Sequence, residues 1–226
     1  MTETWLDDNF QDSVLHRNGY NIFWKDRCNR RGGVLLVIRD QISCIQRTDL
    51  ETESEMLALK IQLNPTCSIF LSVFYRPPNA DESFLADFRY FFNKYSGTGL
   101  TNLVVTGEEF NFPYINWNLG CPIVSDPETV EFCNVLGDFF LLQKNHHVTR
   151  DTSNPSTNGN ILDLVLTNNE YLIKYALVHT NAFDSDHHPL TLSSYMLRKQ
   201  GHKMLDVKFI KRFQINPASG PLFTTA

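Results

Sequence analysis

The amino-acid sequence predicts a single α/β domain in which helices cover β-sheets. The chain has 226 residues, 42% of them hydrophobic, which is enough material for one domain with a sizeable core. Short apolar runs bounded by turn residues recur along the chain, as strands do. These runs outnumber the segments with helical spacing, so sheets covered by helices are the expected architecture.

Six short runs rich in Val, Leu, Ile and Phe predict strands. The runs in residues 33–40 and 101–107 are continuously apolar, which is typical of strands covered on both faces. Residues 56–63 and 188–197 alternate in part between apolar and polar positions. The predicted strands are residues 33–40, 56–63, 68–76, 101–107, 161–168 and 188–197.

Two segments predict helices. Residues 80–95 begin with acidic residues and repeat aromatic or aliphatic side chains at helical spacing, so that one face is apolar. Residues 126–143 begin with Asp126 and Pro127, the pair expected at an N-cap and a first helical turn. The apolar face of the first helix contains Phe84, Leu85, Phe88, Phe91 and Phe92.

Charge and cysteine content exclude several classes of protein. A formal net charge of −5 argues against a strongly basic, non-specific nucleic-acid binder, but not against a nuclease, because metal-dependent enzymes need carboxylates. Two basic segments, residues 24–33 and 198–212, are more typical of solvated surface than of binding patches. The cysteines are odd in number and never spaced C-x-x-C, so neither a disulfide framework nor a zinc site is indicated.

The sequence shows neither a leader nor a membrane span. The first ten residues contain no basic segment followed by an apolar one, and no apolar run approaches the roughly 18 residues of a span. We therefore expect a soluble protein in a reducing, intracellular compartment, with no membrane partner.

Polar residues adjoin the apolar runs and are candidates for chemistry. Each has a simple structural explanation when taken singly, since Asp after a strand is usually a turn former and Tyr at a strand end usually packs its ring. The Glu, Asp and Asn side chains among them are hard oxygen donors, which suit Mg²⁺ or Mn²⁺. The set consists of Glu3, Tyr75, Arg76, Glu109, Asn111, Asp163, Asp186 and His187.

The order of these residues is recognisable. The motifs "ETWL", "YRPPN", "FNFP", "ILDLVLTN" and "SDHHPL" follow one another between Glu3 and Met196. This order closely resembles the endonuclease domain of non-LTR retrotransposons, a branch of the endonuclease/exonuclease/phosphatase superfamily related to DNase I. The resemblance implies an α/β fold of four layers, with two packed mixed sheets flanked by helices. It also implies an endonuclease-like domain over residues 1–196 and a basic and apolar tail over residues 197–226.

The resemblance implies a role for each matching residue. Glu3 would be the principal ligand of a Mg²⁺ or Mn²⁺ ion, with Asp186 also close to the metal. The side chains that would act on the phosphodiester are Tyr75, Glu109, Asn111, Asp163, Asp186 and His187. Among these, Tyr75 would lie near the scissile phosphate and Asn111 would bind a phosphate oxygen, while Asp163 would orient His187 so that it stabilises the developing charge. The following residue, His188, is expected to pack or to face solvent.

Three further residues are candidates for substrate binding, namely Arg76, Thr149 and Arg150. Thr149-Arg150 lies where these endonucleases carry a Thr-Arg pair, although a turn hydroxyl and a surface arginine are an equally good explanation. The implied partners are DNA and the reverse transcriptase domain of a parent element, which uses the 3′-hydroxyl left by cleavage as a primer. The implied location is the nucleus.

Two departures from the family leave other functions open. The family motif "GDFN" is "GEEFN" here, with Glu109 in place of Asp and one inserted residue, and the family's first strands would precede Met1, so we expect an N-terminally incomplete domain. A longer carboxylate displaced by about 1 Å can cost roughly a hundredfold in rate. The alternatives are therefore a catalytically dead fragment that at most binds nucleic acid, and a phosphoesterase of the same superfamily that acts on lipid headgroups.

Overall fold

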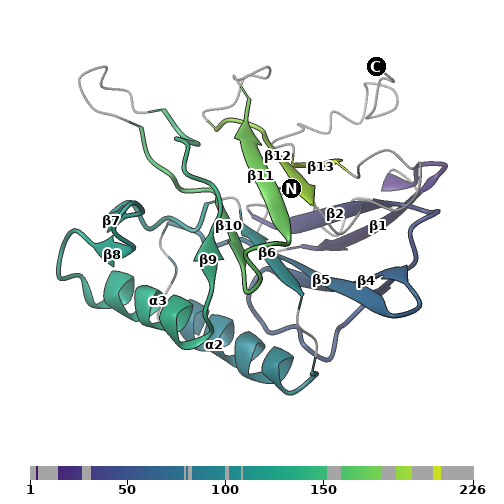
Figure 1. Cartoon of the computed structure of the whole chain (residues 1–226), viewed down its shortest axis with the longest axis horizontal. Helices are drawn as coiled ribbons and strands as arrows, with labels where there is room; N and C mark the ends of the chain where they lie inside the picture. The colour runs from purple at the N-terminus through teal and green to yellow at the C-terminus, as the bar shows by residue number, and fades with distance from the viewer. Residues whose placement is uncertain are drawn as a thin grey trace.

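The chain folds around one mixed sheet (Figure 1). A computed structural model describes residues 4, 15–26, 32–78, 80, 83–99, 102–107, 109–151, 159–179, 187–194 and 206–209, the last four by their backbone. Within them, the main sheet has the order β3-β4-β5-β6-β10-β9. Its strands are β3 (Cys44–Gln46), β4 (Met56–Asn64), β5 (Cys67–Phe74), β6 (Leu103–Gly107), β9 (Leu142–Gln143) and β10 (Leu164–Thr167).

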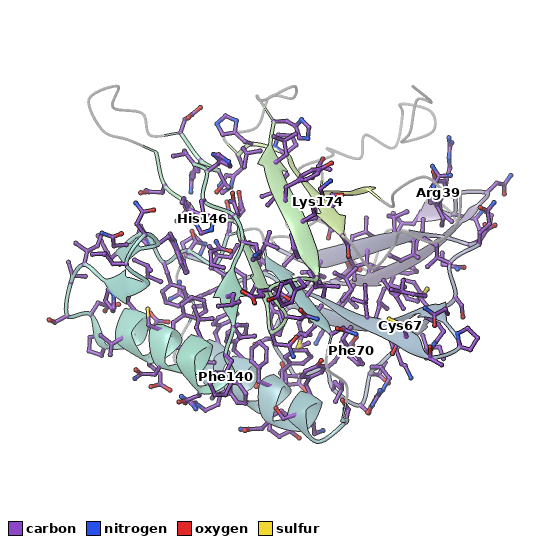
Figure 2. All side chains as sticks on the ribbon, in the orientation of Figure 1. Arg39, Cys67, Phe70, Phe140, His146 and Lys174 are labelled. Atoms are coloured by element: carbon purple, nitrogen blue, oxygen red, sulfur yellow. The ribbon has the colours of Figure 1, made fainter. Side chains whose placement is uncertain are left out.

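Two helices, α2 (Ser83–Ser96) and α3 (Pro127–Asp138), cover one face of this sheet. Helix α2 connects the parallel strands β5 and β6, as a crossover helix must. An aromatic cluster fills the space between helices and sheet, and Figure 2 shows Phe70 within it. At its centre the ring of Phe88 lies 5.0 Å from Phe74 and 5.6 Å from Phe132, measured between ring centroids.

The opposite face of the main sheet is covered by further strands rather than by the described helices (Figure 1). Leu36 of β2 and Leu192 of β12 belong to the second apolar cluster, together with Leu57 and Val73 of the main sheet. These outer strands are β1 (Tyr20–Lys25) with β2 (Val34–Arg39), and β11 (Ile173–Val178) with β12 (Leu190–Ser194) and β13 (Asp206–Phe209). A small hairpin, β7 (Ile115–Asn116) with β8 (Cys121–Pro122), lies beside α3.

The α/β prediction is confirmed, since helices cover one face of the main mixed sheet and two smaller sheets cover the other. All six predicted strands and both predicted helices form, with bounds that differ by a few residues at one or both ends. Residues 139–143 do not continue α3 as predicted: Phe140 has a φ of 53°, and residues 142–143 pair with β10 instead. β13 comes from the predicted tail and pairs with β12. No described helix is both long and apolar enough to cross a bilayer.

The N-cap of α3 provides a test of local stability. Asp126 accepts hydrogen bonds from the backbone N–H and the hydroxyl of Thr129, at 2.9 and 2.6 Å, and these bonds lower the pKa of the Asp126 carboxyl. We expect Asp126→Ala to lower the free energy of unfolding by about 1 kcal/mol in urea titrations at neutral pH. Asp126→Asn keeps an acceptor and should cost much less.

The effect of Asp126 should also depend on pH. A lowered pKa in the folded state means that the ionised cap stabilises the fold above the ordinary range of Asp and that this contribution disappears as pH falls through the folded pKa. The difference in unfolding free energy between wild type and Asp126→Asn should therefore change at acidic pH. A difference that stays constant from neutral to acidic pH would contradict the role of the charge.

Candidate active site

Several of the residues predicted from the sequence lie at one edge of the main sheet. Strands β5 and β6 are parallel and end side by side, with Phe74 opposite Gly107, and β10 begins at the same edge, with Leu164 opposite Gly107. Tyr75 and Arg76 therefore follow β5, Glu109 and Asn111 follow β6, and Asp163 precedes β10. His187 precedes β12 and pairs through its backbone with Arg150.

The centre of this edge is a buried histidine between two carboxylates. Nδ1 of His187 lies 2.8 Å from Oδ2 of Asp163, the contact that the family resemblance implied. Nε2 lies 2.9 Å from Oε1 of Glu109. The three side chains are at most 8% exposed, so the charges interact with little screening by solvent. The hydrogen bond at Nδ1 can hold the imidazole in one orientation.

An unusual backbone turn brings Glu109 to the histidine. Glu109 and Asn111 have φ values of 63° and 53°, a left-handed conformation that costs side-chain-bearing residues energy. The turn is held from the β10 side, because the N–H of Glu109 donates to Oδ1 of Asp163 and that of Phe110 donates to the carbonyl of Leu162. Strand β6 ends at Gly107, so the turn that carries Glu109 lies beyond the strand.

Arg76 and Asn111 contact each other's backbone rather than standing free at the edge. The Arg76 guanidinium donates to the carbonyl of Asn111 at 3.1 Å, and the Asn111 amide donates to the carbonyl of Arg76 at 2.8 Å. Arg76 is also buried, against Phe112 and against Glu128 of α3. Neither residue was predicted to have these contacts, and the predictions that Arg76 binds substrate and that Asn111 binds phosphate remain predictions.

Thr149 connects the two segments that carry Asp163 and His187. Its hydroxyl accepts from the backbone N–H groups of Leu162 and Asp163, both at 3.0 Å, and its carbonyl accepts from the N–H of His188 at 2.8 Å. The residue is 0% exposed. Its hydroxyl therefore accepts hydrogen bonds from backbone groups, as expected of a turn hydroxyl. The substrate-binding assignment of Thr149 and Arg150 stays a prediction.

This contact of Thr149 can be tested by removing the hydroxyl. We expect Thr149→Val to lower the free energy of unfolding by about 1–3 kcal/mol, because two buried N–H groups lose their acceptor while the side-chain volume is kept. Thr149→Ser retains the hydroxyl and is the matched control. Equal urea midpoints for Val and wild type would show that the hydroxyl does not hold this segment.

Two more side chains hold the Asp163 segment and were missed from the sequence. The amide of Asn145, itself 0% exposed, donates to the carbonyl of Asp163 at 3.1 Å, and Oε1 of Gln143 accepts from the N–H of Val165 at 2.8 Å. The side chains thus bond to backbone groups of the β10 segment. Gln143 was predicted to be helical, and "KNHHV" carries no motif that marks Asn145.

The predicted metal ligands Glu3 and Asp186 lie outside the described residues, and so does the inserted Glu108. Their neighbours Thr4 and His187 are described, and both are buried. The Thr4 hydroxyl contacts the carbonyl of Gly32 at 3.4 Å, next to Gly33, whose N–H donates to Glu55. The carbonyl of Glu55 accepts from the N–H of Tyr75, a buried residue of the second apolar cluster. Contacts therefore connect Thr4, the described residue of the "ETWL" motif, to the end of β5.

A divalent cation fits the chemistry of this edge. The donors that the described residues bring here are carboxylate and amide oxygens of Glu109, Asp163 and Asn111, the ligand type that Mg²⁺ prefers. In the part of the chain that the structure covers, no group of three His, Cys, Asp or Glu side chains is placed to hold a metal ion. Any such site would therefore include residues outside the described ranges, where the predicted ligands Glu3 and Asp186 lie.

Comparisons with known proteins identify the family and the fold. The sequence model described as endonuclease-reverse transcriptase matches residues 69–191, which is more than half of the chain. No curated protein matches. The solved endonuclease domain of TRAS1, a telomere-specific non-LTR retrotransposon, is similar in structure, with a TM-score of 0.63, 18% sequence identity, and coverage of 79% of this chain and 81% of that one.

A second similar structure is an endonuclease/exonuclease/phosphatase family protein from Leptotrichia buccalis, with a TM-score of 0.51, 16% identity, and coverage of 79% of this chain and 73% of that one. At these identities the likeness shows the fold. The predicted DNase I-like α/β fold is thereby confirmed.

Proposed function

Because the chain belongs to the endonuclease-reverse transcriptase family, we propose that it is a metal-dependent DNA endonuclease domain of retrotransposon origin. It is an endonuclease/exonuclease/phosphatase domain related to retrotransposon endonucleases. The proposal of endonuclease activity rests on the buried contact between Asp163 and His187. This contact lies at the sheet edge where the residues predicted to act on the phosphodiester come together.

In the proposed reaction, water attacks phosphorus and the bond from phosphorus to the 3′-oxygen breaks. The products are a 5′-phosphate and a 3′-hydroxyl. Glu109 accepts the proton of the attacking water, and the leaving 3′-oxygen takes a proton from solvent water. His187, held by Asp163, stabilises the charge that develops on the phosphate. When bound, a Mg²⁺ or Mn²⁺ ion offsets the negative charge of the phosphate, and Glu3 and Asp186 are the residues that would hold it.

The carboxylates of this edge explain why we propose that metal is needed. Glu109 and Asp163 both contact one histidine, so two carboxylates lie against a single imidazole. A DNA phosphate brings a further negative charge, and like charges in a buried site repel strongly. We expect cleavage to require a divalent cation and to be abolished by EDTA.

The contact between Glu109 and Nε2 of His187 favours low activity. Nε2 is the atom that would face the phosphate, and a carboxylate oxygen lies 2.9 Å from it. Substrate must displace this carboxylate. We therefore expect nicking by the unaltered chain to be weak, and a chain that cannot displace it would be a catalytically silent nucleic-acid binder.

Supercoiled plasmid with Mg²⁺, and separately with Mn²⁺, tests the proposal. The expected result is slow conversion to the nicked form that stops in EDTA, with ends that a DNA polymerase extends without prior phosphatase treatment. Ends that need a 3′-phosphatase before extension would contradict the proposed products. Release of soluble headgroup from phosphoinositide vesicles, with no nicking, would instead identify a lipid phosphoesterase.

We further propose DNA and the reverse transcriptase domain of the parent element as partners, and the nucleus as the location. The family description supports a reverse transcriptase domain as a partner, because it names an endonuclease together with a reverse transcriptase. A 3′-hydroxyl at a nick is the chemical group from which a polymerase extends.

A further inference from the structure

Arg76 was predicted to contact substrate, and its environment in the structure points to a different role. Its side chain is 5% exposed. The guanidinium carbon lies 4.3 Å from the centre of the Phe112 ring and 5.9 Å from that of Phe84. Both rings belong to the aromatic cluster beneath the main sheet. Tyr75, one residue earlier, belongs to the cluster on the opposite face. Alternation along an extended chain thus turns Arg76 away from the face that Tyr75 occupies.

The guanidinium is held by one carboxylate and two carbonyls. Nη2 of Arg76 lies 2.5 Å from Oε1 of Glu128, in the first turn of α3. Nη1 donates to the carbonyls of Phe110 and Asn111, at 3.4 and 3.1 Å. The same charged group therefore contacts a helix and the turn after β6. A buried guanidinium needs such partners, since an uncompensated charge in the interior is costly.

The contact between the two site loops is reciprocal. Asn111 donates from its side-chain amide to the carbonyl of Arg76 at 2.8 Å and to that of Glu109 at 3.2 Å. The turn after β6 contains both Glu109 and Asn111, whose backbones are in the left-handed conformation. Such a conformation persists only where surrounding contacts fix it. The turn is what presents the Glu109 carboxylate to His187.

We propose that Arg76 and Glu128 form a positioning pair that fixes the turn after β6, and with it the carboxylate of Glu109 at the proposed active site. This inference rests on the proposed function. Arg76 acts through Glu109 and Asn111 and does not contact DNA. Glu128, which lies far from the site motifs in sequence, holds the Arg76 guanidinium in place.

Hydrogen exchange of the full chain is the first test, because it needs no activity. We expect Glu128→Gln to raise amide exchange at Glu109 and Phe110 by at least about tenfold while β4 and β5 are unaffected. Glu131→Gln is the matched control, because Glu131 also joins α3 to an arginine of α2, Arg89, but at the surface. The control should leave the turn unchanged. A uniform rise over the whole chain in Glu128→Gln would overturn the proposal in favour of a general stability role.

DNA binding separates positioning from substrate contact. Loss of a phosphate contact lowers the slope of log affinity against log salt by about 0.9. We expect Arg76→Gln and the double variant Arg76→Gln/Glu128→Gln to bind a labelled duplex in Mg²⁺ with the wild-type slope. The double variant keeps the measurement possible if Arg76→Gln leaves Glu128 uncompensated and does not fold. A slope lowered by about one in either variant would overturn the proposal, since Arg76 would then contact DNA.

Nicking kinetics give the third readout. We expect kcat of Glu128→Gln to fall by about tenfold to a hundredfold, with KM for plasmid unchanged, because a displaced catalytic group slows chemistry without weakening binding. If wild type neither binds nor nicks DNA, the proposed function fails, and the exchange at Glu109 and Phe110 alone decides whether the pair fixes the turn. Unchanged exchange in Glu128→Gln would overturn the pair whatever the activity.

Discussion

Deleting Glu108 and replacing Glu109 by Asp is expected to raise plasmid nicking by about a hundredfold. The change restores the family motif "GDFN". It shortens the carboxylate that now lies 2.9 Å from Nε2 of His187, which opens this nitrogen to a phosphate. Misplacement of a reacting group by about 1 Å costs roughly this factor. The measurement is the initial rate of nicking in Mg²⁺ at equal protein concentration.

The two single changes are the controls for this repair. Glu109→Asp alone shortens the side chain but keeps the inserted residue, and deletion of Glu108 alone keeps the long side chain. Because each leaves the carboxylate misplaced, both should fall short of the combined variant. A combined variant that is folded, by its urea transition, and no faster than wild type would show that this loop does not limit activity.

Removing the imidazole should have the largest effect of all in the repaired protein. We expect His187→Ala to reduce the rate of nicking by roughly a thousandfold, since removal of one group that stabilises transition-state charge costs about 10²–10³ in kcat. Asp163→Asn should also lower the rate of nicking. Asp163 holds Nδ1 of His187 at 2.8 Å, and an amide in its place changes which ring nitrogen carries the proton.

A nearby histidine provides the control for these substitutions. His188 lies 3.2 Å from the exposed Asp151 and its ring has no described contact with Asp163 or Glu109. We expect His188→Gln to retain most of the nicking rate of the repaired protein. Loss of activity in His188→Gln with retention in His187→Ala would mean that the two histidines have been assigned the wrong roles.

The fold could be predicted from the sequence to a large extent, because strands and helices leave a local pattern. The apolar runs of β2, β4, β5, β6, β10 and β12 were all found from composition and alternation. β1 and β11 were missed. Strand β11 exposes Lys174 and Tyr175 and alternates weakly, so its sequence carries little of the apolar signal that marks the covered strands. Figure 2 shows Lys174 on this strand.

The candidate site was predictable where a motif lies directly at the end of a strand. Asp163 directly precedes β10 and His187 lies shortly before β12, so the sequence indicated both and the structure places them in contact. Glu3 and Asp186 lie outside the described residues, and their predicted role as metal ligands stays a prediction. Glu128, Asn145 and Gln143 could not be found, because their contacts join segments that local spacing does not relate.

By itself, the sequence determined the α/β class, the positions of the covered strands and the order of the motifs at their ends. These follow from burial, since a strand covered on both faces must be apolar and its polar residues must lie where it ends. Only the tertiary structure decided what each polar side chain contacts. Thr149 bonds to backbone 13 residues away and Arg76 bonds to Glu128, 52 residues away, because sheet register and helix packing bring those segments together. The same packing placed the Glu109 carboxylate on His187, and a linear pattern of residue types carries no record of that distance.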